Sequence, residues 1–357
     1  MGGKLTISIS STDSESPKFL SLEGLRGILA LLVCVGHLGL NTMANKIGLT
    51  VRFGLAVDVF FALSGFVLCY SNYFGRRTLK RFIVGRFARL YPVYAVTFVV
   101  TALMAPAFAN GANIRIFVQQ VFLLQNIGLW PNVLPQNFPN WSISVEFWIS
   151  ILFFMALRKR TSRLLILLAV VALPAILVPT YISGDAQNTF SVVNFGLLRG
   201  IAGFGVGAAA FLAFEKLGAK VVLPQFVVYI PSAMLGVFFF LENWSRMTIL
   251  AFYAVLLTCL VLLAANDRTT LLASRPLVFV GTISYSIYLL HIPIYLALSL
   301  AIGDASIRGA VKPAVLLIVL TASYLSYRWV ERPSQQIILN KLRTGSLLRG
   351  GVRAAEK

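Results

Sequence analysis

Long apolar segments separated by short polar stretches follow one another along nearly the whole chain. Each segment is close to the length of about 20 residues that an α-helix needs to cross the hydrocarbon core of a membrane. Ten segments can be delimited, at approximately residues 22–40, 51–71, 90–106, 141–157, 164–181, 192–214, 221–241, 247–265, 281–301 and 309–330. The pattern predicts an all-α, polytopic integral membrane protein with about ten transmembrane helices.

The polar stretches divide the chain into one membrane domain and two tails. We expect a short polar tail at residues 1–20, a transmembrane domain at 21–333 and a basic tail at 334–357. Residues 107–140, which are rich in Pro, Asn and Gln, form the one long connection within the domain. This connection contains IRIFVQQVFLL, for which we predict a short interfacial or re-entrant helix.

The distribution of charge predicts how the segments are oriented. With a cytoplasmic N-terminus, 23 of the 31 Lys and Arg residues fall on the inner side and 6 on the outer side. Cytoplasmic loops collect Lys and Arg, so both termini are predicted to be cytoplasmic. The net charge of +19 also raises the question of nucleic acid. Because the basic residues lie in short loops and do not alternate with aromatic residues on a polar surface, we expect membrane lipids and no nucleic acid as partners.

The cysteines and a glycine-rich stretch can both be explained by helix packing. Cys34, Cys69 and Cys259 lie inside apolar segments without metal-ligand spacing, which predicts packing residues and no metal site. The glycines of RGIAGFGVG, Gly203 and Gly207 among them, do not open a strand-to-helix turn. We expect them to let two membrane helices approach closely instead of binding a phosphate.

Ionisable side chains inside a membrane span are costly and suggest a function, and six of those within the predicted segments are candidates: Arg26, His37, Asp58, Glu146, Arg199 and His291. Eleven residues of α-helix make about three turns and rise roughly 16 Å, so Arg26 and His37 share one helix face. We expect the other four residues, His37, Asp58, Glu146 and Arg199, to share a depth in the outer half of the membrane. A structural salt-bridge network would explain these charges. A titratable imidazole at the same depth would also suit general-base chemistry.

The stretch RRTLKRFIVGRFARLYP, residues 76–92, begins the third segment with a cluster of basic side chains. Arg86 and Arg89 are i,i+3 neighbours on one helix face, and Arg26 is predicted at a similar level. Guanidinium groups match the geometry of phosphate oxygens, so the three arginines could form an anion clamp. Anionic lipid headgroups would satisfy the same side chains.

A second polar pair lies in SYSIYLLHIPIY, residues 284–295. Tyr288 and His291 are again i,i+3 neighbours, and His291 is predicted close to the middle of the membrane. Both residues could belong to a reaction site. His291 could equally be a buried histidine that is hydrogen-bonded to a hydroxyl on a neighbouring helix.

Seven stretches of the chain resemble, in order, motifs of the acyltransferase-3 family of bacterial integral membrane O-acyltransferases. They are LEGLRGILALLVCVGH, VDVFFALSGFVLCYS, RFARLYPVY, NWSISVEFW, LRGIAGFGVG, VGTISYSIYLLH and YRWVERP. The matches run from residue 22 to residue 333, which is nearly the whole predicted domain. No SGNH-type hydrolase domain is expected after the last span.

The resemblance implies transfer of an acyl group, often acetyl from acetyl-CoA, to a hydroxyl of a carbohydrate or similar acceptor at the bacterial inner membrane. His37 matches the motif histidine that is held essential for transfer, and Arg26 matches its partner. Arg86 and Arg89 match the R-x-x-R pair that is thought to face the donor. Tyr288, like Glu146, matches a recurrent polar position of the family.

These matches lead to a hypothesis in which acyl-CoA is a donor substrate and no cofactor is bound. His37 would act as the general base, with a carboxylate of Glu146 or Asp58 orienting its imidazole. Arg199 or Tyr288 could stabilise the developing oxyanion. A transporter or flippase of a glycolipid or anion is the alternative, because intramembrane charges also mark transport paths. The acyl group, the acceptor, the membrane leaflet and the oligomeric state stay open.

Overall fold

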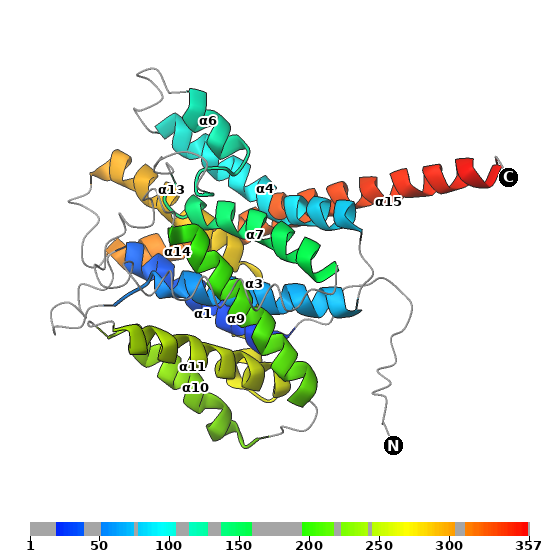
Figure 1. The fold of residues 1–357 in the computed structure, drawn as a ribbon. Coiled ribbons are helices and arrows are strands. Elements are labelled where there is room, and N and C mark those ends of the chain that lie inside the picture. The colour runs from blue at the N-terminus through cyan, green and yellow to red at the C-terminus, as the bar shows by residue number, and fades with distance from the viewer. Residues whose placement is uncertain are drawn as a thin grey trace, which may run out of the picture.

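The computed structural model describes residues 19–38, 51–74, 78–104, 114–127, 137–158, 195–217, 223–241, 245–303 and 311–355. All regular elements in these ranges are helices (Figure 1). They are α1 (Leu20–His37), α3 (Leu55–Phe74), α4 (Leu79–Met104), α6 (Ile114–Val121), α7 (Asn140–Arg158), α9 (Phe195–Leu217), α10 (Gln225–Phe238), α11 (Arg246–Ala265), η3 (Leu271–Ala273), α12 (Arg275–Thr282), α13 (Ser284–Ile302), α14 (Val311–Ser326), the π-helical turn η5 (Tyr327–Glu331) and α15 (Arg332–Ala355).

Eight helices within these ranges are long and apolar enough to cross a membrane. The candidate spans in these helices begin at Leu20, Leu55, Leu79, Asn140, Gly196, Met247, Ser284 and Val311. The prediction of an all-α polytopic membrane protein is therefore confirmed. Predicted segment 221–241 corresponds to the 14-residue helix α10, and segment 164–181 lies outside the described residues.

Several helices begin or end at other residues than the predicted segments, because a helix can continue through basic residues at which the apolar pattern stops. Helix α4 begins at Leu79, so most of the arginine-rich stretch is helical and not a loop. Helix α1 ends at His37, which puts this histidine at the end of the helix and not within it. The predicted basic tail from residue 334 belongs to α15, which continues the last span away from the other helices (Figure 1).

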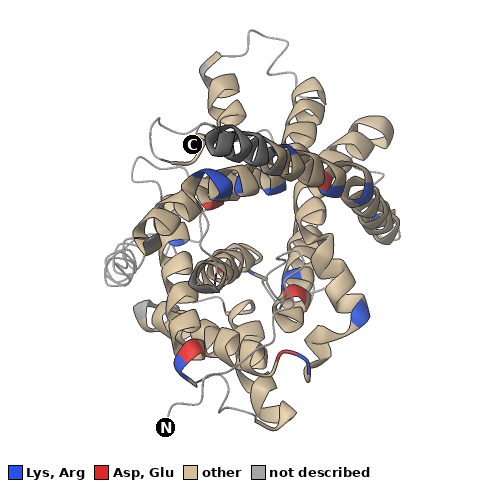
Figure 2. Cartoon of the chain, turned by 90° about the vertical axis from the view of Figure 1, so that its right-hand side faces the viewer, with Lys and Arg blue, Asp and Glu red and all other residues tan. Residues whose placement is uncertain are grey.

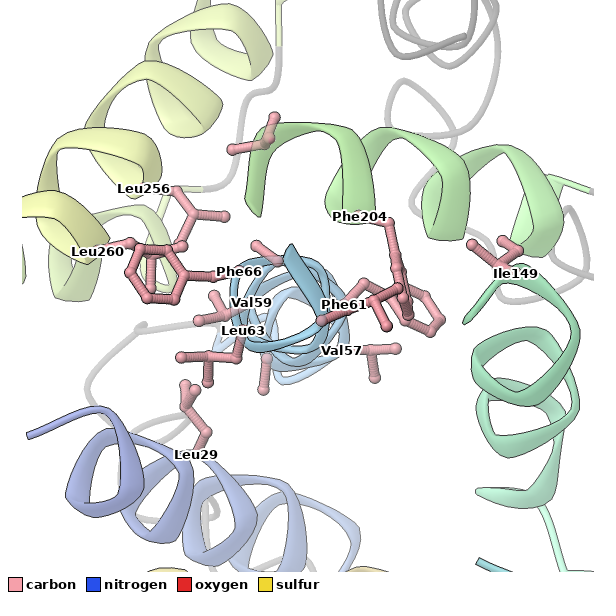
Figure 3. Close-up of a cluster of buried hydrophobic side chains, with 14 of the residues drawn as sticks. Leu29, Val57, Val59, Phe61, Leu63, Phe66, Ile149, Phe204, Leu256 and Leu260 are labelled. Atoms are coloured by element: carbon pink, nitrogen blue, oxygen red, sulfur yellow. The ribbon is translucent and has the colours of Figure 1, made fainter. Parts of the chain in front are cut away.

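Helix α3 is the centre of the bundle and is covered on several sides. Figure 3 looks along this helix and shows side chains such as Val59, Phe61 and Phe66 spreading from it toward α1, α9 and α11. Each of these three side chains is at most 2% exposed. A helix that is apolar all round can be buried in this way, and burial of such side chains stabilises the bundle.

Glycines bring α3 and α9 together at the distance of backbone contact. A Cβ atom added at Gly207 would lie 2.0 Å from the carbonyl oxygen of Ala62, and one at Gly65 would lie 2.3 Å from that of Phe204. Gly203 faces Phe61 and the Asp58 carbonyl in the same way. The predicted packing role of these glycines is confirmed. The three cysteines, which are buried and free, also agree with their prediction.

Charged residues gather toward the side of the molecule where α15 leaves it. Figure 2 views this side and shows acidic positions beside basic ones on several helices. Arg26 and Arg86, which the sequence predicted at a similar level in the membrane, each form a salt bridge with a glutamate.

Candidate active site

The two histidines of the chain contact each other. Nδ1 of His37, the last residue of α1, lies 2.9 Å from Nε2 of His291 on α13, and the two rings stack with an interplanar angle of 14°. His291 is fully buried, whereas His37 is exposed. The pair therefore has one member accessible to a substrate and one held in the protein interior.

A backbone carbonyl fixes the direction of the hydrogen bonds when both imidazoles are neutral. Nδ1 of His291 lies 3.1 Å from the carbonyl oxygen of Ile287, which can only accept. Nδ1 of His291 therefore carries the hydrogen, its Nε2 accepts, and Nδ1 of His37 donates to it. This arrangement leaves the lone pair of His37 on Nε2.

The partner of His37 differs from the carboxylate expected from the sequence. Among the described residues its imidazole contacts His291 and the ring of Phe138, whose centroid lies 5.9 Å away. Glu146 instead accepts hydrogen bonds from Ser64 Oγ at 2.9 Å and from Arg86 at 3.1 Å. A histidine on α13 thus takes the position that we expected Glu146 or Asp58 to occupy.

The predicted arginines do come together, but carboxylates lie among them. Arg26 forms a salt bridge of 3.0 Å with Glu23, and Arg86 forms one with Glu146. Arg26 also interacts electrostatically with Arg89 and Glu146. We refer to Arg26, Arg86 and Arg89 with Glu23, Glu146 and Glu331 as the inner charge cluster. Within the described residues, Arg89 forms no salt bridge, so its guanidinium is the one most available to an added anion.

Glu331 is the member of this cluster that the sequence analysis did not single out. It lies in the π-helical turn between α14 and α15, is 8% exposed, and accepts a hydrogen bond of 2.8 Å from Ser286. Arg26 and Arg89 both interact with it electrostatically. Its position in YRWVERP, at the end of the last predicted span, was the signal that could have identified it.

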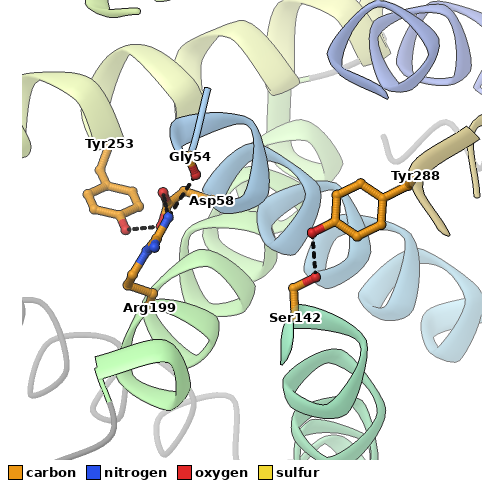
Figure 4. A network of polar contacts seen from close by, with 6 residues as sticks. All are labelled: Gly54, Asp58, Ser142, Arg199, Tyr253 and Tyr288. Carbon is orange, nitrogen blue, oxygen red and sulfur yellow. Dashed lines mark hydrogen bonds and ion pairs between the residues drawn. The ribbon is translucent and has the colours of Figure 1, made fainter. Parts of the chain in front are cut away.

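Asp58 and Arg199 form a separate buried network near the first turns of α3 and α9 (Figure 4). The guanidinium donates to the Asp58 carboxylate from Nε at 3.1 Å and from Nη2 at 2.7 Å, and Nη2 also donates to the Gly54 carbonyl. The Tyr253 hydroxyl donates to the same carboxylate, and the guanidinium lies over the ring of Trp141. The prediction that Asp58 and Arg199 share a depth holds for this pair.

Glu146 lies deeper than this network. Its partner Ser64 follows Asp58 by six residues on α3, which corresponds to a rise of roughly 9 Å. The predicted common depth of Asp58 and Glu146 is therefore wrong. The two carboxylates belong to different networks, one near the first turn of α3 and one in the inner charge cluster.

Tyr288 lies between the inner charge cluster and the histidine pair. Its hydroxyl is 2.8 Å from Ser142 Oγ on α7, four residues before Glu146, and its ring neighbours that of His291 (Figure 4). Helix α13 therefore contributes Ser286 to a contact with Glu331, and Tyr288 and His291 to neighbouring positions one turn apart. No group of three or more potential metal ligands was found among the described side chains.

The histidine pair and the inner charge cluster thus lie toward opposite ends of α1 in a bundle of apolar helices, which is the arrangement of an integral membrane protein. The family model of the acyltransferase domain, Acyl_transf_3, matches residues 19–328. The chain therefore belongs to the acyltransferase-3 family, as the sequence motifs predicted. Apolar spans and bacterial relatives also agree with the predicted multi-pass location in the bacterial inner membrane.

Curated relatives match to different extents. Acyltransferase MdmB of Streptomyces mycarofaciens is 33% identical over 36% of this chain and 36% of its own length. A protein designated a membrane-bound transacylase, BcsY of Komagataeibacter xylinus, is 27% identical over 87% of this chain and 81% of its own. O-acetyltransferase OatA of Staphylococcus aureus is 22% identical over 89% of this chain and 57% of its own.

Two of these relatives are much longer than the part of them that this chain matches. The chain spans about half or less of the length of two of the relatives it matches, a picA-locus protein of Rhizobium radiobacter and MdmB. No solved structure matches the chain significantly. Family membership is established, while activity and substrates are matters for proposal.

Proposed function

We propose that the protein is a membrane O-acyltransferase that moves an acyl group, acetyl in the first instance, from acyl-CoA to a hydroxyl of a carbohydrate acceptor. The observation that carries this proposal is the histidine pair, because its hydrogen bonds leave a lone pair on an accessible nitrogen, His37 Nε2. The names of relatives, which include an O-acetyltransferase and a transacylase, support the same reaction class.

In the proposed reaction the acceptor oxygen attacks the carbonyl carbon of the thioester while His37 Nε2 takes the hydroxyl proton. The C–S bond then breaks, and the imidazolium returns the proton to the departing CoA sulfur, so the enzyme is regenerated. His291 stabilises the charged form of His37 by accepting its Nδ1 hydrogen. The Tyr288 hydroxyl, one turn before His291, is the nearest candidate donor to the developing oxyanion.

The inner charge cluster is the proposed donor end. Phosphate groups of CoA would be bound by Arg89 and, through exchange of carboxylate partners, by Arg86 and Arg26. Arg26 lies eleven residues before His37 on α1, so the thioester must reach roughly 16 Å along this helix. The hydroxyls of Ser286, Tyr288 and Ser142 between the two ends support passage of a neutral polar arm.

The test is transfer of label from radioactive acetyl-CoA by the purified protein in nanodiscs. Octyl glycosides and a bacterial lipid extract serve as acceptors, beside His37→Ala. We expect the variant to fold and to transfer about 10²–10⁴ times more slowly, because it lacks the general base. Cys34→Ala is the matched control, since Cys34 lies buried one turn before His37 and its thiol has no role in the proposal.

Two results would overturn the proposal. Transfer by His37→Ala at the parent rate would make this histidine structural. Movement of a fluorescent glycolipid across the membrane without acyl-CoA, together with no transfer of label by the parent, would favour the transporter.

A further inference from the structure

Six buried side-chain amides lie on α6, on the residues that directly follow it, and just before and at the start of α7. Each is at most 6% exposed: Gln119, Gln120, Gln125, Asn126, Asn137 and Asn140, which we call the amide cluster. Eight of their side-chain nitrogen and oxygen atoms have no hydrogen-bond partner, out of ten such buried atoms among the described residues. Both polar atoms of Gln120 and of Asn140 are unpaired.

Hydrogen bonds connect the members of the cluster. The Tyr94 hydroxyl on α4 donates to the backbone carbonyl of Gln120 at 2.7 Å, and Gln125 Nε2 lies 3.3 Å from the same hydroxyl. Gln125 Nε2 also donates to the backbone carbonyl of Asn140, and the backbone N–H of Asn140 donates to the backbone carbonyl of Asn137 at 2.9 Å. These bonds bring Gln120, Gln125, Asn137 and Asn140 into one region.

One end of the amide cluster adjoins the histidine pair. Asn137 Nδ2 donates to the Leu289 carbonyl at 2.8 Å, two residues before His291 on α13. The next residue along the chain, Phe138, contacts the ring of His37. Asn137 keeps an unpaired side-chain oxygen at this place. A ligand bound by the cluster would thus extend toward His37.

Unpaired buried amides destabilise a protein, so their accumulation in one region needs a reason other than stability. Amides offer both donors and acceptors without net charge, which matches the hydroxyl groups of a neutral carbohydrate. An anionic ligand would instead be recognised by cations, and those lie in the inner charge cluster. We propose that the amide cluster is the acceptor site and binds hydroxyl groups of a neutral carbohydrate beside His37. This inference rests on the proposed acyltransferase function.

Entry to the cluster requires that its cover move. Helix α6 carries Gln119 and Gln120 on its buried face and the exposed Phe117 on the other. The hydroxyls of Tyr91 and Tyr94 on α4 hold it through the carbonyls of Val121 and Gln120. An acceptor that enters between α6 and α4 would have to replace these two neutral contacts.

The decisive variants are Gln120→Leu and Asn140→Leu, which keep similar volume and remove two unpaired polar atoms each. In the acceptor-free protein neither side chain makes a hydrogen bond, so we expect the thermal midpoint to stay equal or rise. The KM for octyl glycosides should rise about tenfold for each variant, the effect of one lost hydrogen-bonding group in the complex. Hydrolysis of acetyl-CoA without acceptor should be unchanged, because it does not use this site.

Asn72→Leu is the matched control. Asn72 lies on α3 outside the amide cluster and also has an unpaired Nδ2, so its replacement should leave the acceptor KM unchanged. An unchanged KM in both cluster variants, or a fall in their thermal midpoint, would overturn the proposal, since the amides would then be dispensable or structural.

Binding of octyl glycosides to the same nanodiscs, measured by calorimetry without acyl-CoA, separates this proposal from the proposed function. Binding that both cluster variants weaken, without transfer by the parent, would retain the amide site and refute the acyltransferase. Transfer by the parent that the leucines do not affect would refute the amide site alone.

Discussion

The buried pair of Asp58 and Arg199 allows a structural role to be distinguished from a catalytic one. In Arg199→Met the carboxylate of Asp58, which is fully buried, loses two N–H donors from the guanidinium and keeps the bond from the Tyr253 hydroxyl. A buried charge left without its partner costs about 3–5 kcal/mol of folding free energy. We expect the single variant to lose this amount.

The double variant Asp58→Leu/Arg199→Met removes the charge as well. It removes one neutral hydrogen bond from the Tyr253 hydroxyl and one from the Gly54 carbonyl, at a cost of about 1–3 kcal/mol. The double variant should therefore be more stable than Arg199→Met alone. It should also retain transfer, because neither residue contacts the histidine pair.

Unfolding in mixed SDS micelles gives the free energies, and transfer of label from acetyl-CoA gives the activity. Asp58→Leu alone completes the double-mutant cycle. A double variant that is no more stable than Arg199→Met would refute the account of the ion pair. A folded double variant without transfer would return Asp58 or Arg199 to the catalytic site, as the sequence had suggested.

Three further variants test other parts of the structure. His291→Ala should lower kcat about 10²-fold at unchanged acetyl-CoA KM, since His37 loses the acceptor of its Nδ1 hydrogen; an unchanged kcat would contradict this. Arg89→Gln should raise the acetyl-CoA KM about tenfold, and Arg89→Lys should recover part of it; equal KM values would exclude Arg89 from donor binding. Gly207→Ala should cost about 1–3 kcal/mol in SDS unfolding because of the Ala62 carbonyl, whereas Gly85→Ala, with open space around it, should cost little.

The apolar pattern predicted the helices well because a membrane span has a fixed minimum length. The errors occur where charge and hydropathy disagree. Helix α4 continues through the arginines before residue 90, since long basic side chains can extend toward the membrane surface while the backbone stays helical. Helix α10 is shorter than its predicted segment because Pro224 stands at its N-cap and the helix ends at Phe238.

Within the site, the sequence could predict only how residues of one helix lie relative to each other. The i,i+3 spacing of Tyr288 and His291 and the shared face of Arg26 and His37 follow from helix geometry. The contact between His37 and His291 joins residues 254 positions apart, and no periodicity specifies such a pair. The same limit applies to the two carboxylates. Charge alone could not show which basic side chain Glu146 would meet and which Asp58 would meet. Packing of α7 against α3 and α4 decides that Glu146 meets Ser64 and Arg86.

The pairing of charges also bears on the choice between an enzyme and a transporter. An ion or proton path needs titratable groups that exchange partners along its length, whereas Asp58 is bound to Arg199 by two hydrogen bonds. Between the inner charge cluster and the histidine pair, α13 presents the neutral hydroxyls of Ser286 and Tyr288. A path with charge at one end, hydroxyls in the middle and a neutral base at the other suits a phosphate-bearing donor whose reactive end is uncharged. Among the residues that the structure describes, no relay of charged groups joins the two ends for an ion to follow.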